Sequence, residues 1–186
     1  MKNANGDSVE SWLYPPLDPV PGKKYLLVLY IHGGPQGFDG DYFDVGLENQ
    51  IFPAAGMAVL RVNYRGSTSY GEAFCHSLWG DWHWREYEDL MLSVDAAIAT
   101  GWVDPDRLGL GGWSYGGIMT IWTVGHTDRF KLECLSVSKS ITCRASGRTN
   151  GSRSIWPSSA IRSTMPITIA SSRQAHTPPT SRRRCT

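Results

Sequence analysis

The chain has 186 residues, of which 41% are hydrophobic and 19% are charged, and its formal net charge is +1. This length is sufficient for one globular domain with a hydrophobic core. The longest apolar run, Tyr25 to Ile31, is far shorter than the roughly 20 residues that cross a bilayer. The segment Met1 to Asp7 is polar and lacks the apolar stretch of a secretory signal. These features exclude a membrane-spanning segment, and we expect a soluble, cytoplasmic protein without membrane contacts.

Charge divides the chain into two parts of different composition. Residues 1–134 hold nine Lys and Arg against all 17 Asp and Glu, a net charge of −8, together with seven of the eight Trp residues. Residues 135–186 hold nine Lys and Arg and no acid, a net charge of +9. This second part has few large apolar side chains to offset the entropy of ordering, so it is predicted to fold poorly. Its charge would attract phosphate, but a single aromatic residue, Trp156, and the lack of a known binding module argue against a nucleic-acid partner.

The four cysteines are Cys75, Cys134, Cys143 and Cys185. They form no CxxC pair and have no histidine at the spacing of a zinc site. We therefore expect no metal site and no cofactor. Free thiols in a reducing compartment are the simplest interpretation of this pattern.

Hydrophobic patterning predicts strands that alternate with helices. Apolar runs at Tyr25–Ile31, Met57–Tyr64 and, more briefly, Leu108–Leu110 predict buried strands. Glu86–Thr100 carries apolar residues at the spacing of an amphipathic helix, and Ile118–Val124 is apolar enough for a buried helix. This alternation is typical of a mostly parallel α/β sheet flanked by helices.

The motif Gly112-x-Ser114-x-Gly116 stands between the last of these strands and the apolar helix. In a nucleophile elbow, a serine occupies a strained strand-to-helix turn, where flanking glycines avoid collisions with the neighbouring strand and helix. The hydroxyl then projects above the end of the strand, at the helix N-terminus. A chance glycine-rich turn is the alternative, and the strand–turn–helix context favours Ser114 as a catalytic nucleophile.

A second glycine-rich segment, His32–Pro35, follows the first buried strand. In hydrolases with a nucleophile elbow, the oxyanion hole combines the backbone N–H after the nucleophile with one from such a loop. We therefore expect the N–H groups of Gly34 and Tyr115 to form the hole. His32 is interpreted as shaping the loop through hydrogen bonds rather than as the catalytic base.

Five ordered motifs resemble the prolyl oligopeptidase family of serine peptidases, and most of all the branch of acylaminoacyl peptidases and dipeptidyl-peptidase-like enzymes. The motifs are His32–Pro35, Asn63–Gly71, Tyr87–Asp89, Asp104–Leu108 and Gly111–Gly117, and the resemblance extends from Asp7 to Thr142. It implies an α/β-hydrolase fold, a peptide substrate, and a preceding β-propeller that filters substrates by size. The chain contains none of that propeller, and Ser8–Leu13 is expected to be the first strand of the hydrolase domain.

Two neighbouring segments are given structural roles. Within Asn63–Gly71, we expect Arg65 to pair with a carboxylate and Tyr64 to pack under the sheet. The aromatic cluster Trp79–Trp84 is expected to contribute to core and loop packing rather than to a platform for a peptide.

The acid and the histidine of a catalytic triad are missing from the expected positions. In α/β-hydrolases they follow the nucleophile in the order Asp or Glu, then His. After Ser114 the only acids are Asp128 and Glu133, and the only histidines are His126 and His176. Asp128, Glu133 and His126 fall too close to the elbow, and His176 lies in a segment without any acid. No standard triad can be assembled, so we expect this polypeptide to be inactive by itself.

These observations divide the chain into two regions. Residues 1–142 form the N-terminal part of an α/β-hydrolase domain that is incomplete in its C-terminal half. Residues 143–186 form a tail rich in Ser, Thr and Arg that is disordered or frame-shifted. The abrupt loss of acids indicates a reading-frame shift near residues 134–146. Translation of the gene in the other two frames tests this hypothesis, which fails if neither frame restores an acid and a histidine in a hydrolase-like context.

The function predicted from these features is hydrolysis of peptide bonds through an acyl-enzyme on Ser114. A carboxylesterase is the alternative enzyme, because the elbow and the hole serve esters equally well, although Asn63–Ser67 favours the peptidase. A non-catalytic fragment is the third possibility. The oligomeric state is left undecided.

Overall fold

The computed structural model describes residues 1–40, 48–136 and 141–145, and these contain six strands and four helices. The strands are β1 (Glu10–Tyr14), β2 (Tyr25–Ile31), β3 (Ala58–Asn63), β4 (Val103–Trp113), β5 (Phe130–Ser136) and β6 (Ile141–Ala145). The helices are α1 (Glu48–Ala54), α2 (Glu72–Cys75), α3 (Trp84–Ala99) and α4 (Tyr115–His126).

Parallel pairings occupy the middle of the sheet, whose strand order is β1-β3-β2-β4-β5-β6. β2 runs parallel to both β3 and β4, and β4 runs parallel to β5. The outermost described strands, β1 and β6, are antiparallel to their neighbours. Parallel neighbours need a crossover connection, and α1, α3 and α4 provide these connections. The prediction of a mostly parallel α/β sheet flanked by helices is confirmed.

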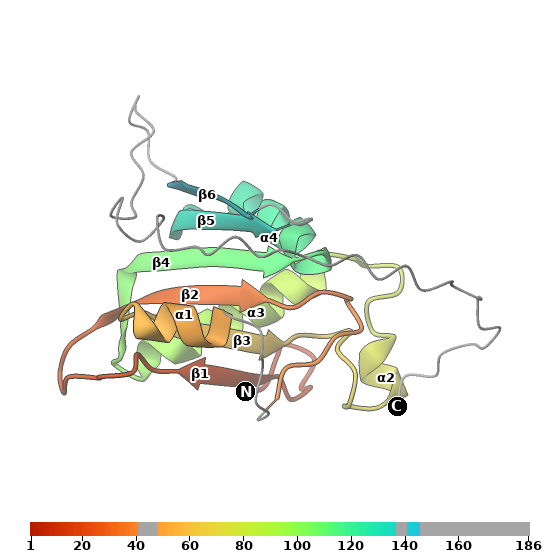
Figure 1. The fold of residues 1–186 in the computed structure, drawn as a ribbon. Coiled ribbons are helices and arrows are strands. Elements are labelled where there is room, and N and C mark those ends of the chain that lie inside the picture. The colour runs from red at the N-terminus through yellow and green to blue at the C-terminus, as the bar shows by residue number, and fades with distance from the viewer. Residues whose placement is uncertain (41–47, 137–140, 146–186) are drawn as a thin grey trace, which may run out of the picture.

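Helices lie on both faces of the sheet. Figure 1 shows α1 in front of the sheet and α3 and α4 behind it. α3 turns Leu90, Val94 and Ala97 toward the core, and each of them is buried. These residues recur every three or four positions, so they form one stripe of the helix, as the sequence predicted for Glu86–Thr100. Full burial of a Leu or Val side chain contributes about 1.5–3 kcal/mol, so this stripe holds α3 on the sheet.

β4 is much longer than the predicted strand at Leu108–Leu110. Gly111 and Gly112 continue its ladder, paired with the end of β2 on one side and with β5 on the other. The predicted strand ended before these two glycines, at Leu110, and a turn was expected to follow it. They remain in the strand because two flanking strands saturate their backbone hydrogen bonds, and the chain turns only at Ser114.

α4 is only half buried, although its sequence predicted a buried helix. Met119, Thr120 and Thr123 face the sheet and are buried. Ile118 and Ile121, by contrast, are 46% and 54% exposed. The sheet covers one side of the helix, and an all-round apolar sequence does not show which side that is.

The C-terminal end of the described chain crosses the boundary placed at residue 142. β6 spans Ile141–Ala145 and pairs with β5. The rest of the predicted tail, residues 146–186, lies outside the described residues and stays a prediction.

The prediction of a free thiol from the cysteine spacing was wrong for Cys75. This residue is buried at the end of α2 and is disulfide-bonded, whereas a free thiol was expected. The error has a simple cause, because the spacing of cysteines along a sequence does not show which of them meet in space.

Among the helices of the described residues, none has both the length and the apolar character needed to cross a membrane.

Candidate active site

Ser114 occupies the single residue between the end of β4 and the start of α4. Its backbone angles are φ 55° and ψ −115°, and it is one of three non-glycine residues with positive φ in the described ranges. Such a conformation costs about 1–3 kcal/mol and has to be held by the surrounding structure. The side chain is exposed, and its hydroxyl neither caps α4 nor has another hydrogen-bond partner among the described residues. The hydroxyl is therefore free to react.

The glycines of the elbow are required by close approaches of the backbone. A Cβ on Gly112 would lie 2.6 Å from the carbonyl oxygen of Ile31 and 2.6 Å from the carbonyl carbon of Gly116. A Cβ on Gly116 would overlap the same Ile31 oxygen and lie 3.0 Å from the carbonyl oxygen of His32. α4 therefore starts in direct contact with the end of β2, and only glycine fits at either position.

The glycine-rich loop after β2 lies beside the elbow. A Cβ on Gly33 would meet Ser114 Cβ at 3.3 Å and the carbonyl oxygen of Trp113 at 3.1 Å. Gly34 has φ 139°, a conformation that favours glycine. Neither the backbone N–H of Gly34 nor that of Tyr115 has a hydrogen-bond partner in the part of the chain that the structure describes. Both predicted donors are thus without a hydrogen-bond partner among the described residues, and the loop that carries Gly34 contacts the elbow through Gly33.

His32 supports this loop from behind, as the sequence indicated. Its Nε2 lies 3.0 Å from Ser67 Oγ, and its ring stacks on Tyr64 with 4.4 Å between the ring centres. The Tyr64 hydroxyl also donates a 3.0 Å hydrogen bond to the His32 carbonyl oxygen. Burial lowers the pKa of His32, so the ring is neutral at pH 7. The interpretation of His32 as a residue that shapes the loop is confirmed.

Tyr115, which follows the serine, is fixed through its side chain. Its hydroxyl donates a hydrogen bond to a carboxylate oxygen of Glu86, in the first turn of α3. Its ring forms a T-shaped pair with the ring of Trp82, with 5.8 Å between the ring centres, and stacks with the ring of His83 at 6.0 Å between centres. Sequence reasoning missed Glu86, because a single acid in the first turn of a helix signals only helix initiation.

Arg65 forms the buried ion pair that was expected. Its Nε lies 2.9 Å from Asp89 Oδ2, and its backbone N–H donates to the same oxygen at 2.8 Å. A second ion pair joins Arg65 to Glu88 at 2.8 Å. These bonds tie the loop after β3 to α3, and Tyr64 beside it is fully buried, as predicted.

The sequence profile of the prolyl oligopeptidase family matches residues 43–140, just over half of the chain. The chain belongs to the prolyl oligopeptidase family. This result confirms the resemblance seen in the motifs, and with it the α/β-hydrolase fold.

Individual peptidases match about two thirds of the chain. The uncharacterized peptidase YuxL of Bacillus subtilis is 44% identical over 129 residues, which are 68% of this chain and 19% of that protein. Dipeptidyl-peptidase 5 of Porphyromonas gingivalis is 30% identical over 69% of this chain and 19% of its own length. The structure of a puromycin-hydrolyzing peptidase of Mycobacterium tuberculosis superposes with a TM-score of 0.64 at 34% identity, over 70% of this chain and 20% of that one. The chain thus spans about a fifth of the length of these relatives.

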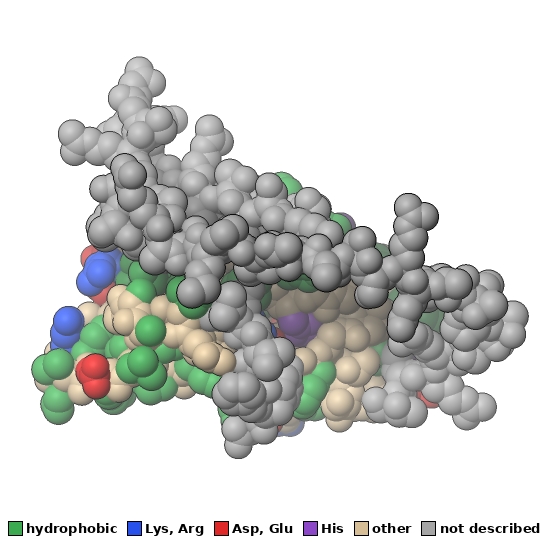
Figure 2. All heavy atoms as spheres, in the orientation of Figure 1, with side chains coloured by type: hydrophobic (Ala, Val, Ile, Leu, Met, Phe, Trp, Pro, Cys, Tyr) green, Lys and Arg blue, Asp and Glu red, His purple; other side chains and the backbone are tan. Residues whose placement is uncertain are grey.

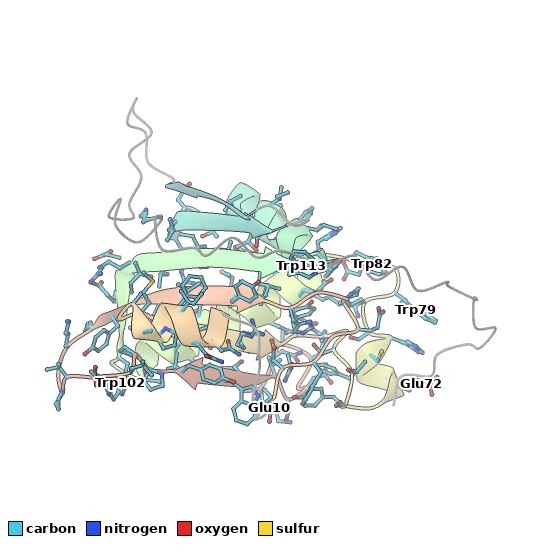
Figure 3. All side chains as sticks on the ribbon, viewed as in Figure 1. Glu10, Glu72, Trp79, Trp82, Trp102 and Trp113 are labelled. Atoms are coloured by element: carbon cyan, nitrogen blue, oxygen red, sulfur yellow. The ribbon has the colours of Figure 1, made fainter. Side chains whose placement is uncertain are left out.

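The prediction that the tryptophan cluster contributes to the core was wrong, whereas its predicted loop packing agrees with ring contacts of Trp79 to His76, Trp82 to Tyr115 and Trp84 to Tyr87. Trp79, Trp82 and Trp84 are 66%, 43% and 46% exposed, so they do not belong to the core. Figure 3 shows Trp82 at the same end of the sheet as Trp113, with Trp79 farther out beyond the strand ends. In Figure 2 a histidine is visible near the middle of this face, among hydrophobic and uncharged atoms. Exposed tryptophan side chains therefore lie at the end of the sheet where the elbow is found.

His126, the described histidine that follows the elbow in the sequence, does not stand where a general base is needed. His126 ends α4, whereas Ser114 precedes that helix, so about 18 Å of helix, at 1.5 Å per residue, separates them. The His126 ring stacks on Trp122, and its Nδ1 lies 2.7 Å from the carbonyl oxygen of that residue. His176 lies outside the described residues. The exclusion of His126 as the base of this family's triad thus rests on distance as well as on sequence order.

Proposed function

We propose that Ser114 is the nucleophile of a serine peptidase of the prolyl oligopeptidase family and that Gly34 and Tyr115 supply its oxyanion hole. The observation that carries this proposal is an exposed serine with positive φ that contacts the glycine-rich loop, together with two backbone N–H groups, of Gly34 and Tyr115, that have no partner among the described residues. Family membership supports a hydrolase. The cost of the strained turn supports a functional role, because strain of this kind is retained where the mechanism needs it.

The chemistry follows from these positions. Ser114 Oγ attacks the carbonyl carbon of the scissile bond while its proton passes to a general base, and the carbonyl oxygen becomes an oxyanion. The N–H groups of Gly34 and Tyr115 donate to that oxyanion, and each such donor lowers the barrier by about 3 kcal/mol. The proton then passes to the leaving amine as the C–N bond breaks. Water finally hydrolyses the acyl-enzyme ester and restores the serine.

A peptide is the substrate class that we propose. Peptidases and dipeptidyl-peptidases are named among the relatives, and they support this choice over a simple ester. The exposed tryptophans near the elbow provide apolar surface for peptide side chains. Since the chain spans about a fifth of those relatives, the selection of a particular peptide belongs to the whole protein.

We also propose that the 186-residue polypeptide, tested alone, holds Ser114 as an unactivated hydroxyl. No acid follows Glu133 in the sequence, and neither histidine after the elbow suits the role of general base. A frame shift near residues 134–146 is our proposed cause. Without a base, the oxyanion hole alone retains about 10³–10⁴-fold catalysis over water.

A burst assay with added imidazole tests the reaction class, because imidazole replaces the missing base. Stopped-flow absorbance follows the release of nitroaniline from a peptide anilide and of nitrophenol from an ester. We expect a burst equal to the protein concentration that requires imidazole and disappears in Ser114→Ala. Ser69→Ala is the matched control, because Ser69 is also an exposed serine with positive φ.

Each outcome of the assay has a defined meaning. A burst with the anilide supports the peptidase, and a burst with the ester alone supports the carboxylesterase. A burst without imidazole overturns the proposal that Ser114 is unactivated. A burst that persists in Ser114→Ala overturns the assignment of the nucleophile.

A further inference from the structure

Glu86 is a buried carboxylate for which the proposed chemistry has no direct use. Its side chain is fully buried in the first turn of α3. One carboxylate oxygen accepts the hydrogen bond of the Tyr115 hydroxyl, and the other, Oε2, has no hydrogen-bond partner among the described residues. A buried, half-satisfied acid is costly to keep, so its retention calls for a role beyond packing.

The surroundings of Glu86 favour a carboxylate that accepts rather than donates. Glu86 lies at the N-terminus of α3, where unpaired N–H groups attract negative charge. Burial raises the pKa of Tyr115, and the hydrogen bond from Tyr115 to Glu86 and the charge of Glu86 raise it further. Tyr115 is therefore a neutral hydrogen-bond donor at pH 7. The hydrogen bond between them joins α3 to the elbow.

Hydrogen bonds fix Tyr115 both through the backbone turn around it and at its side chain, and Glu86 accepts the bond at the side chain. At the backbone end, the N–H groups of Gly117 and Ile118 donate to the carbonyl oxygen of Ser114 at 2.9 and 3.2 Å and close the first turn of α4. At the side-chain end, the phenol is bonded to Glu86. A rotation of the first turn of α4 would move the Tyr115 N–H away from the oxyanion, and it would also break the bond to Glu86.

We propose that Glu86 is a positioning residue that fixes the Tyr115 N–H in the oxyanion hole through the Tyr115 hydroxyl. This inference rests on the proposed role of Ser114. Glu86 acts through Tyr115 and does not touch the substrate, because its free oxygen is shielded from solvent. A displacement of an oxyanion donor by 1 Å is enough to lower catalysis by about 100-fold.

Amide hydrogen exchange measured by mass spectrometry tests this role without any need for activity. The reporters are the amides of Gly117 and Ile118, which close the turn after Ser114. In Glu86→Ala and in Tyr115→Phe, we expect at least tenfold faster exchange at these two amides and unchanged exchange in β2 and β3. Glu86→Gln keeps an acceptor oxygen, so we expect exchange within threefold of the wild type. Asp95→Ala, an exposed acid on the same helix, is the matched control and leaves all of these amides unchanged.

Two results would overturn the proposal. The first is unchanged exchange at Gly117 and Ile118 in both Glu86→Ala and Tyr115→Phe. The second is equal acceleration in these amides and in β2 and β3, which indicates a general loss of stability. If Glu86→Ala does not fold, Tyr115→Phe and the rescue by Glu86→Gln decide the question.

A second readout separates this inference from the proposed function. The rate constant of the imidazole-dependent burst should fall at least tenfold in Tyr115→Phe. It should be retained in Glu86→Gln. If the wild type shows no burst but the exchange response is as expected, the role of Ser114 fails while the bond from Tyr115 to Glu86 still fixes the elbow. If the burst is present and neither variant changes it, Glu86 has no positioning role and the role of Ser114 stands.

Discussion

Replacing Gly116 by alanine perturbs the contact between α4 and β2 on which the geometry of Ser114 depends. The added Cβ would overlap the carbonyl oxygen of Ile31 and lie 2.8 Å from its carbonyl carbon, where ordinary contacts begin at 3.4 Å. Both opposing atoms belong to the backbone of a buried strand, so no flexible side chain can move aside. The helix has to shift, and Ser114 shifts with it.

The expected cost follows from two opposing effects. Overpacking costs about 1–3 kcal/mol, and a clash with rigid backbone belongs at the upper end of this range or beyond it. Alanine in a helix gains up to about 1 kcal/mol over glycine. Gly125 provides the control, because it lies in the same helix and a Cβ there meets no atom within 4 Å. We therefore expect Gly116→Ala to lose at least about 2 kcal/mol and Gly125→Ala to gain about 0.5–1 kcal/mol.

Urea unfolding followed by tryptophan fluorescence measures both changes. With slopes of about 1–3 kcal/mol per M, a loss of 2 kcal/mol lowers the midpoint by about 0.7 M or more. Gly125→Ala should raise the midpoint slightly. Equal midpoints for Gly116→Ala and the wild type would refute the reasoning, because α4 would then not press on β2 at the elbow.

Two further predictions concern the supports of the site. Removal of Asp89 leaves the buried guanidinium of Arg65 without its main partner, so Asp89→Ala should lose about 3–5 kcal/mol in urea unfolding. Glu88 is 43% exposed, and Glu88→Ala should lose less than about 1 kcal/mol; similar losses for both would contradict a dominant buried pair. Burial lowers the pKa of His32 below its ordinary 6.5, so the folded state binds fewer protons than the unfolded state. The stability that His32 contributes is therefore complete above about pH 6.5 and is lost as the pH falls through the folded pKa. The urea midpoint should decline less between pH 7 and 5 in His32→Gln than in the wild type, and parallel declines would argue against a neutral buried ring.

Much of the fold could be predicted, because local patterns and long-range packing agree there. β2 is apolar at every position and is buried between two strands, so its continuous apolar run is enough to predict it. The elbow is also local, since the strand, the glycines and the helix adjoin in sequence. The length of β4 could not be found in this way, because Gly111 and Gly112 have no strand propensity and extend the strand only through pairing with both neighbours.

The parts that sequence missed depend on contacts between distant segments. Glu86 and Tyr115 are 29 positions apart, and no pattern in either segment predicts their hydrogen bond. Trp79, Trp82 and Trp84 were expected in packing because tryptophan is large and apolar, yet no described helix or strand covers them enough to bury them. The type of a residue gives the tendency of its side chain to be buried. Only the topology decides whether another element lies where it can cover that side chain.

The measurement that tests the central claim most directly is the site of reaction with a fluorophosphonate, mapped by mass spectrometry with and without imidazole. The polypeptide should react at Ser114 only when imidazole is present and should not react there faster than at Ser69 without it. Ser114→Ala should abolish the imidazole-dependent adduct, and Ser69→Ala should leave it unchanged. An imidazole-dependent adduct on another residue, or equal reaction at Ser114 and Ser69 in imidazole, would contradict the claim that this elbow presents a catalytic nucleophile.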